Sequence, residues 1–531
     1  MDASGAGSRS AEENGEEGAA GAPGTERAAE RGAAGAAGAA GPERTAVALV
    51  CLALAGSCAG AGLAAAVARA LGAAPLGPAA LGTALGIAAC CGLGRRRLAA
   101  RLPAELDGWL RRRRAWGAVW IAVAVLAVAN TARIGLFVAD PAQVWASATP
   151  PIPASVRHQC FAAYVRAGEL AAAGQADLWR HADYARPAPG THADTAIDGL
   201  GDYLLDPYEY PPVFAVLPRA AVAATRDYHV LRAAWFAISA AGFWLAFVGV
   251  AIWIRGRAGA TALLLAPVLA LSLPLVINLQ FGQAHLIVVA AAMGAMLQFA
   301  RGRRAAGAVL LALATATKVF PGLLLVHLAV RRQWRDLGAT LVALAALVGL
   351  AALVLGPATL AAFVTEHVPR MASGEAFSNT EENPDNHALY GLAFKLATLG
   401  VPSAGRELGA ALAWIWGVLA LILAALGSRG RVAPARDAVI WLGVLCLATL
   451  RSPFAPMYSA VGTLWLLAVW AGAARPRWWW TAAVAASWAV LQGFPAIFSD
   501  PVNVLASFPS QIATIALAVA AVWPRPRAAA P

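Results

Sequence analysis

The sequence consists of long apolar runs separated by short clusters of arginine. Hydrophobic residues make up 60% of the 531 positions and charged residues only 13%, whereas soluble domains are usually about 45–50% apolar and about 25% charged. The apolar runs often reach about 18 residues or more, the length of a transmembrane helix. We therefore expect an all-α polytopic membrane protein. Scoring the shorter apolar runs as half-membrane helices gives about 10–14 membrane helices.

Positive and negative residues separate along the chain. The net charge is +12, but the arginines lie in short turns such as Arg111–Arg114 and Arg301–Arg304. A nucleic-acid site would need a continuous basic face with aromatic platforms, so nucleic acid is not an expected partner. The positive-inside rule assigns the arginine turns to the cytoplasm. Two polar loops, residues 140–212 and 356–386, hold 14 of the 29 acids and are expected on the outer side.

Composition also predicts the domain boundaries. Residues 1–44 contain no Val, Ile, Leu or aromatic residue, so we expect a disordered cytoplasmic tail there. This tail lacks the layout of a signal peptide. Residues 45–114 read as two spans followed by a basic cytoplasmic segment. Residues 115–525 read as the main membrane domain, and residues 526–531 as a short C-terminal tail.

The loop 140–212 is the longest polar stretch between membrane segments. Within it, Ser155–Ala173 has one apolar side and is predicted to form a helix on the membrane surface. Gly174 is a plausible stop for that helix. Pro211–Ala224 is apolar but short for a span, so we expect a re-entrant or half helix.

Two carboxylates, Asp206 and Glu209, flank Tyr208 directly before this re-entry. A carboxylate at the edge of a half-buried cavity has a raised pKa and is suited to act as a general base. Solvated loop charges are the alternative interpretation. His158, on the predicted surface helix, is a further candidate.

Lysine is rare in this chain, which has two lysines and 39 arginines. Both lysines, Lys318 and Lys395, lie in apolar segments, where a charge is costly unless it is paired or faces a wet cavity. Lys318 and Pro321 interrupt an apolar stretch, and broken membrane helices often line binding sites. A lysine at such a break is suited to bind phosphate. A lysine whose head reaches the membrane interface is the alternative.

Three further polar residues begin apolar segments: Gln283, His285 and His387. Such groups either cap and bridge membrane helices or belong to a functional site. Of the six cysteines, only Cys160 lies in an outer loop. No Cys or His pattern has zinc-ligand spacing, so the sequence predicts neither a metal site nor a disulfide.

Several short motifs together resemble glycosyltransferase family 87. This family comprises bacterial GT-C-type membrane glycosyltransferases and includes mannosyltransferases that use polyprenyl-phosphate mannose. The resemblance spans roughly residues 115–525. The motifs, in chain order, are Tyr164…Ala167…Leu170…Gly174…Leu178-Trp179, the lip Tyr210-Pro211-Pro212, Gly282-Gln283, Lys318-x-x-Pro321, Asn386-His387-x-Leu389, and Ser452-Pro453 followed by Tyr458.

The resemblance implies a GT-C-like helix bundle and an inverting sugar transfer. The donor would be a polyprenyl-phosphate hexose, mannose-like, or pentose, and the acceptor a lipid or glycan. No nucleotide sugar or other cofactor is expected, and the reaction would occur at the outer face of the bacterial cytoplasmic membrane. A carboxylate would accept the acceptor's proton, and basic groups would hold the departing phosphate.

The chain departs from the family at two positions. The family's acid at the start of the first loop helix falls near Cys160, and its Gln-x-Asn pattern is Gln283-Ala284-His285. We therefore expect Asp206 or Glu209 to be the base, with His158 as second choice. A lipid-linked sugar flippase and a non-catalytic family member remain alternatives. The expected donor-binding residues are Lys318, Gln283, His285, Lys395 and His387.

Overall fold

The computed structural model describes residues 40–109, 114–184, 200, 203–377, 386–402, 404–430, 432–474, 477–493 and 500–524. Within these ranges the regular structure is helical, and extended segments meet only at an isolated bridge between His158 and Leu204. The predicted all-α class is therefore confirmed. The predicted C-terminal tail and residues 1–39 of the predicted N-terminal tail lie outside the described residues.

Seven described helices are long and apolar enough to cross a membrane, and a bent pair raises the number to eight. Only 11% of the most apolar window is buried in α3 and in α15, and Leu353 of α15 is 86% exposed. Exposed apolar helices of this length are typical of a lipid-facing surface. The seven are α2 (Pro42–Ala70), α3 (Leu76–Arg101), α5 (Arg114–Ala139), α9 (Tyr228–Ile254), α15 (Trp334–Leu355), α19 (Arg406–Gly427) and α23 (Asp500–Val522).

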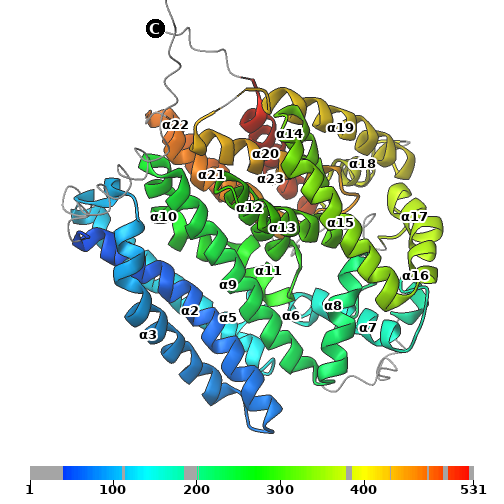
Figure 1. The fold of residues 1–531 in the computed structure, drawn as a ribbon, viewed down its shortest axis with the longest axis horizontal. Coiled ribbons are helices and arrows are strands. Elements are labelled where there is room, and N and C mark those ends of the chain that lie inside the picture. The colour runs from blue at the N-terminus through cyan, green and yellow to red at the C-terminus, as the bar shows by residue number, and fades with distance from the viewer. Residues whose placement is uncertain are drawn as a thin grey trace, which may run out of the picture. The chain divides into compact units, whose positions relative to one another are not determined.

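Shorter helices pack against these spans (Figure 1). Several of these shorter helices are too short to cross a membrane alone, as we expected for half-membrane helices. The shorter helices are α8 (Pro212–Ala224), α12 (His285–Ala300), α13 (Arg304–Thr317), α14 (Leu324–Val330), α18 (Leu389–Thr398), α20 (Pro434–Arg451), α21 (Val461–Ala473) and α22 (Trp478–Val490).

The first two spans form a closely packed hairpin. Glycines face each other across it, and a Cβ on Gly56 would lie 2.5 Å from the carbonyl oxygen of Gly86. Small residues let membrane helices approach in this way. The helix α2 begins at Pro42, inside the expected tail 1–44, because proline favours a first helical position and Arg44 forms an ion pair with Asp107 at 2.9 Å. The tail therefore ends earlier than predicted.

Two apolar stretches are broken. The apolar pattern over residues 260–277 predicts a single span, but the structure has α10 (Gly256–Ala270) and α11 (Leu273–Phe281), bent by 61°. Pro274, in the first turn of α11, has no N–H to continue the hydrogen-bond ladder of α10, and this explains the bend. The break predicted at Lys318–Pro321 is confirmed. Lys318 is extended after α13, and Pro321 lies in the 3₁₀ turn η4 (Phe320–Leu323).

The first outer loop differs from the predicted surface helix. The structure has two helices, α6 (Pro153–Arg157) and α7 (Cys160–Ala172), and most of α7 is buried. A single helix on the membrane surface was therefore wrong. The reason is that aromatic side chains cover one side of α7, while Gly168 lets the backbone of α8 approach at Pro218. Gly174 has φ +78°, which confirms the predicted stop.

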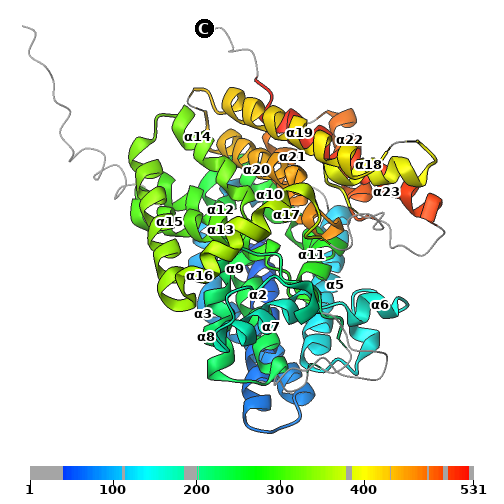
Figure 2. The same cartoon turned by 90° about the vertical axis from the view of Figure 1, so that its right-hand side faces the viewer.

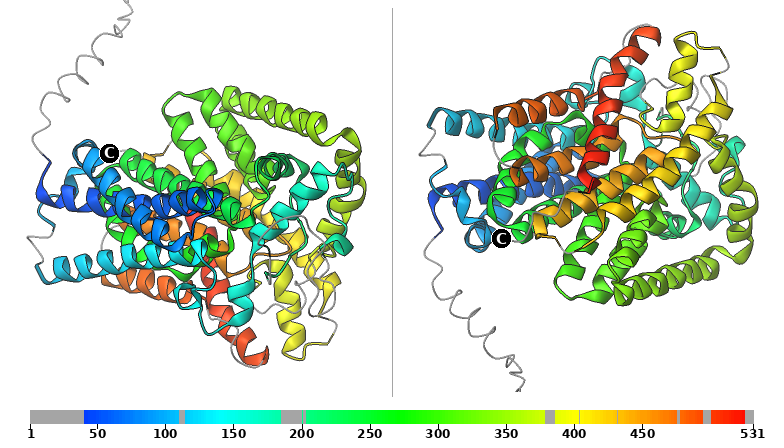
Figure 3. Two further views of the ribbon diagram at one scale, coloured as in Figure 1. Left: turned by 90° about the horizontal axis from the view of Figure 1, so that it is seen from below. Right: turned by 90° about the horizontal axis from the view of Figure 1, so that it is seen from above.

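The second outer loop continues from α15 through α16 (Pro357–Ala362), η5 (Phe363–His367) and α17 (Val368–Ser373). Figure 2 and Figure 3 show these short helices turning back from the end of α15. The span α15 also contacts α8 of the first loop region. The two outer loops therefore lie next to each other, although about 150 residues separate them in sequence.

Candidate active site

The bridge between two extended segments positions the first part of the site. Gln159 is extended, with φ −144° and ψ 92°, and separates α6 from α7. Leu204 donates its N–H to the carbonyl of Arg157 at 2.9 Å, next to the bridge with His158. This pairing brings Asp206 to His158, with the carboxylate Oδ2 3.4 Å from Nε2 of the imidazole. The two side chains are 26% and 28% exposed, so the pair remains accessible.

Cys160, the first residue of α7, completes this cluster. Its Sγ lies 3.3 Å from the same Nε2 atom of His158, and the thiol is buried. Burial raises the pKa of Cys160 well above its ordinary value; the Asp206 charge adds to this shift and the Lys318 charge opposes it. Burial also raises the pKa of Asp206, and His158 partly offsets that rise. We refer to His158, Cys160 and Asp206 as the His-Cys-Asp cluster.

Next to this cluster, three tyrosines meet one glutamine. The hydroxyls of Tyr164 and Tyr210 are 2.7 Å apart, and both lie within hydrogen-bond distance of Gln283 Oε1, at 3.0 and 2.6 Å. Gln283 Nε2 donates to the hydroxyl of Tyr458 at 2.8 Å. The backbone N–H of Ala284 donates to Tyr164 at 3.1 Å, which leaves the tyrosine proton free for Gln283.

This tyrosine–glutamine network joins four segments that the sequence motifs named separately. They are α7, the Tyr-Pro-Pro lip, the turn between α11 and α12, and the 3₁₀ helix η6 (Met457–Ala460). Tyr164 and Tyr458 entered the sequence argument only as motif letters, without a proposed site role. Their burial among apolar neighbours gives no separate sequence signal, because buried tyrosines are common in protein cores.

The turn between α11 and α12 depends on Gly282. Its φ of +63° is in the left-handed region, and its carbonyl accepts a hydrogen bond from Trp235 Nε1 at 2.8 Å. An added Cβ would lie 2.7 Å from the Cβ of Phe161 on α7. Only glycine allows both this backbone conformation and this close approach. Gly282 thereby fixes the position of Gln283 against α7.

Lys318 reaches the network from the break after α13. Its Nζ lies 5.2 Å from the centroid of the Tyr210 ring, within the range of a cation–π contact. The following Phe320 stacks on His285, with centroids 5.2 Å apart and an interplanar angle of 25°. The predicted donor-site residues Lys318, Gln283 and His285 therefore lie in one region of the fold.

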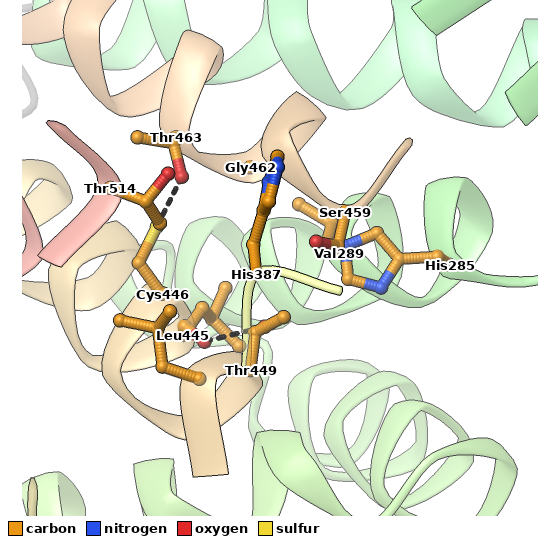
Figure 4. A pocket seen from close by; sticks show the side chains of 11 residues that line it. His285, Val289, His387, Leu445, Cys446, Thr449, Ser459, Gly462, Thr463 and Thr514 are labelled. Carbon is orange, nitrogen blue, oxygen red and sulfur yellow. Dashed lines mark hydrogen bonds between the residues drawn. The ribbon is translucent and has the colours of Figure 1, made fainter. Parts of the chain in front are cut away.

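His285 and His387 line the same small cavity, of about 10 Å³, enough for roughly one water molecule. Figure 4 shows both imidazoles beside Ser459, with Cys446 and Thr463 on another wall. Lys395 is linked to His387 through Gln511, and its Nζ donates to Gln511 at 3.1 Å. Gln511 in turn donates to the carbonyl of His387 at 3.2 Å. Lys395 thus contacts α23 and lies in a separate polar group from Lys318.

The two carboxylates of the lip do not share a site. Glu209 lies between two imidazoles, 3.5 Å from His181 and 3.3 Å from His367 of the second outer loop. The Trp179 ring stacks on His367 at 5.2 Å, and Trp179 donates to the carbonyl of Tyr210 at 3.0 Å. Glu209 therefore joins the two outer loops, whereas Asp206 belongs to the His-Cys-Asp cluster. Neither His181 nor His367 has a distinguishing sequence context.

The lip itself starts a helix. Pro212 is the first residue of α8, where a proline costs no hydrogen bond. The hydroxyl of Tyr208 donates to the carbonyl of Pro211 at 3.3 Å, and Trp179 donates to the carbonyl of Tyr210, so two hydrogen bonds hold the lip. This keeps Tyr210 between Lys318 and Gln283.

Comparison with known proteins finds a family match. Residues 208–453, a little under half of the chain, match the family model of glycosyltransferase family 87. This match supports the suspected family over those residues. The matched part includes the lip, Gln283, His285, Lys318, His387 and Lys395, and it begins two residues after Asp206. No curated protein and no solved structure matches the chain.

Proposed function

We propose that this chain, which belongs to glycosyltransferase family 87 through residues 208–453, transfers a sugar from a polyprenyl phosphate to a lipid or glycan acceptor. Its apolar helices and its family support a membrane glycosyltransferase. The observation that carries the finer proposal is that the carboxylate of Asp206 lies 3.4 Å from His158 beside the start of α7, while the ammonium group of Lys318 lies 5.2 Å from the ring of Tyr210, which contacts Tyr164 of the same helix. One small region thus offers a proton acceptor and a phosphate ligand.

In the proposed reaction, Asp206 takes the proton of the acceptor hydroxyl as its oxygen attacks the anomeric carbon. The bond between that carbon and the phosphate oxygen breaks, and the electron pair leaves with the phosphate. A base with a raised pKa is better matched to a hydroxyl proton than an ordinary aspartate. The bond forms on the side opposite the leaving group, so the anomeric configuration inverts.

Lys318 holds the polyprenyl phosphate in this proposal. A charge-assisted contact to phosphate is strong where water is excluded, and Tyr210 restrains the ammonium group from one side. Gln283 fixes Tyr210, and His285 lies beside the same helix break. His387 and Lys395 are more distant candidates for contacts with the donor. The donor already carries an activated sugar, so the transfer requires no nucleotide cofactor.

The family resemblance favours a mannose-like hexose as the transferred sugar, with a pentose as the second choice. The arginine turns support an N-terminus in the cytoplasm and a site that faces outward from a bacterial cytoplasmic membrane. The apolar surfaces of the half-membrane helices would accept the prenyl tail.

The proximity of Asp206 to Cys160 bears on the alternative of a non-catalytic family member. The acid expected near Cys160 is absent, but the carboxylate of Asp206 reaches the same cluster from a different segment. A carboxylate is therefore present where the resemblance places the base. This favours a catalytic protein over a scaffold.

The test is sugar transfer by purified protein reconstituted in lipid. Radiolabelled polyprenyl-phosphate mannose, glucose and arabinose are each supplied with extracted envelope lipids and glycans as acceptors. We expect one donor to give a labelled product whose new glycosidic bond has the inverted configuration. Movement of the labelled lipid across vesicles without any product would instead support a flippase, and neither movement nor transfer would support a scaffold.

A further inference from the structure

The His-Cys-Asp cluster has a property that a general base does not require. One ligand atom from each residue lies within 4.8 Å of the other two, although the three residues come from a loop, a helix start and the end of the first outer loop. Cys160 is buried, and the other two side chains are partly exposed. The cluster is therefore closed on the thiol side and open on the side of the imidazole and carboxylate.

One imidazole nitrogen faces both of its neighbours in this cluster. His158 Nε2 faces both Asp206 Oδ2, at 3.4 Å, and Cys160 Sγ, at 3.3 Å. A single imidazole nitrogen either carries a proton and donates, or presents a lone pair and accepts. It cannot donate to the carboxylate and accept from the thiol at the same time. The 3.4 Å contact is also longer than the ~2.7–2.9 Å of a charge-assisted hydrogen bond.

A metal ion would satisfy all three groups at once. Tetrahedral zinc binds His nitrogen at about 2.0–2.1 Å and Cys sulfur at about 2.3 Å, which places neighbouring ligand atoms roughly 3.3–3.6 Å apart. The two distances at Nε2 agree with that spacing. Three protein ligands with one open position are also the usual composition of a catalytic zinc site.

The charges agree as well. A metal deprotonates a thiol that coordinates it. Thiolate, carboxylate and neutral imidazole together carry two negative charges, which a divalent ion neutralises.

We propose that His158, Cys160 and Asp206 bind a divalent ion of the zinc class, with the fourth position open to the acceptor hydroxyl. A spacing motif could not have revealed this site, because the bridge to Leu204 brings Asp206 to the other two ligands from 46 residues away. The binding of the ion stands independently of the proposed reaction, while its catalytic role rests on the proposed function.

In that role the ion would lower the pKa of the coordinated hydroxyl. The hydroxyl proton would move to the Asp206 carboxylate oxygen that does not hold the ion. The acceptor oxygen would bond to the anomeric carbon while the phosphate leaves with the electron pair of the broken bond. The metal does not change its oxidation state, so no oxidant or reductant is required.

The test uses Co²⁺ as a spectroscopic substitute in the full-length protein after removal of bound metal with a chelator. We expect about one Co²⁺ per chain with a near-ultraviolet thiolate-to-cobalt band, as a Cys ligand requires. Cys160→Ser should abolish the band, and His158→Asn should weaken Co²⁺ binding by at least ~10-fold. Cys90→Ser, which changes a cysteine of α3, is the matched control and should retain the band.

Absence of a thiolate band in the wild-type protein would overturn the ion site, as would a band that survives Cys160→Ser. The transfer assay separates this result from the proposed function. Transfer that depends on Asp206, resists chelation and occurs without Co²⁺ binding would leave the function in place and remove the ion. Co²⁺ binding through Cys160 with no transfer from any donor would leave the ion site in place and remove the proposed function.

Discussion

At the scale of single residues, the lip shows how two neighbouring acids acquire different tasks. Asp206 and Glu209 are three positions apart, and nothing in the sequence separates their roles. The structure pairs Asp206 with His158 and Glu209 with His181 and His367. The contacts of each side chain, which depend on distant segments, decide between a chemical and a structural role.

The pairing of Glu209 with His181 predicts a pH-dependent stability. Hydrogen bonding to Glu209 raises the pKa of His181 above its ordinary 6.5, and burial and Arg370 oppose this rise. Because the folded state favours the protonated imidazole, the stabilisation is fully present below the unfolded pKa and is lost as the pH rises through the folded pKa. The Tm difference between wild type and Glu209→Gln should therefore be largest below about pH 6.5.

Thermal unfolding of both proteins between acid and alkaline pH measures this difference. His181→Gln provides a second comparison, because it should remove the same pH dependence while leaving the carboxylate in place. A Tm difference that grows as the pH rises would contradict the assignment of Glu209 as the partner that stabilises protonated His181.

The tyrosine–glutamine network predicts a large effect at Gln283. Replacement by leucine, of similar size, removes the acceptor shared by Tyr164 and Tyr210 and the donor to Tyr458. Tyr164 and Tyr210 keep their mutual contact, but the hydroxyl of Tyr458 loses its partner, and a buried hydroxyl left without a partner costs about 1–3 kcal/mol. We expect Gln283→Leu to lower the free energy of unfolding more than Tyr458→Phe, which removes one hydroxyl. Equal costs in denaturant titrations would show that the network does not act as a unit.

At the scale of elements, breaks between helices position the site. The bend between α10 and α11 and the interruption after α13 bring Gln283 and Lys318 to the same tyrosine. The sequence predicted the second break from a lysine and a proline inside an apolar run. It missed the first, because the apolar pattern continues through Leu271 and Ser272 and hydropathy does not report a bend.

The turn at Gly282 gives a prediction with a matched control. Gly282→Ala forces a side chain into the left-handed region and against Phe161, whereas Gly302→Ala has the same backbone demand, with φ +72°, and open space around it. We expect Gly302→Ala to cost about 1 kcal/mol and Gly282→Ala clearly more, with loss of transfer activity. Similar Tm values and activities for the two variants would contradict the close packing of this turn on α7.

At the scale of the whole molecule, the family match covers residues 208–453, while the His-Cys-Asp cluster and the α2–α3 hairpin precede it. Fold class followed from the sequence because long apolar runs permit only helices in a membrane. The location of the site could be predicted from the sequence in part, since the motifs meet in one network. The His-Cys-Asp cluster could not be predicted, because it depends on a bridge between residues that carry no pairing pattern.

The hairpin attaches to the matched segment through α2 and α9. A Cβ on Gly62 of α2 would lie 2.5 Å from the carbonyl oxygen of Ala233 on α9, whereas Gly77 of α3 has nothing within 4 Å. Gly62→Leu should therefore separate the two helices and lower the Tm, and Gly77→Leu should change it little. Overpacking of this kind costs about 1–3 kcal/mol. An unchanged Tm in Gly62→Leu would contradict the direct packing of α2 on α9.

The most direct measurement compares single-turnover sugar transfer by wild type, Asp206→Asn and Glu209→Gln. An alkaline pH is used, where the His181 pairing contributes least to stability. A positioned general base contributes about 10²–10⁴-fold, so Asp206→Asn should reduce the rate constant by that factor while the Tm stays near that of the wild type. Glu209→Gln should retain most of the rate. Full activity in Asp206→Asn, or a loss confined to Glu209→Gln, would contradict Asp206 as the base.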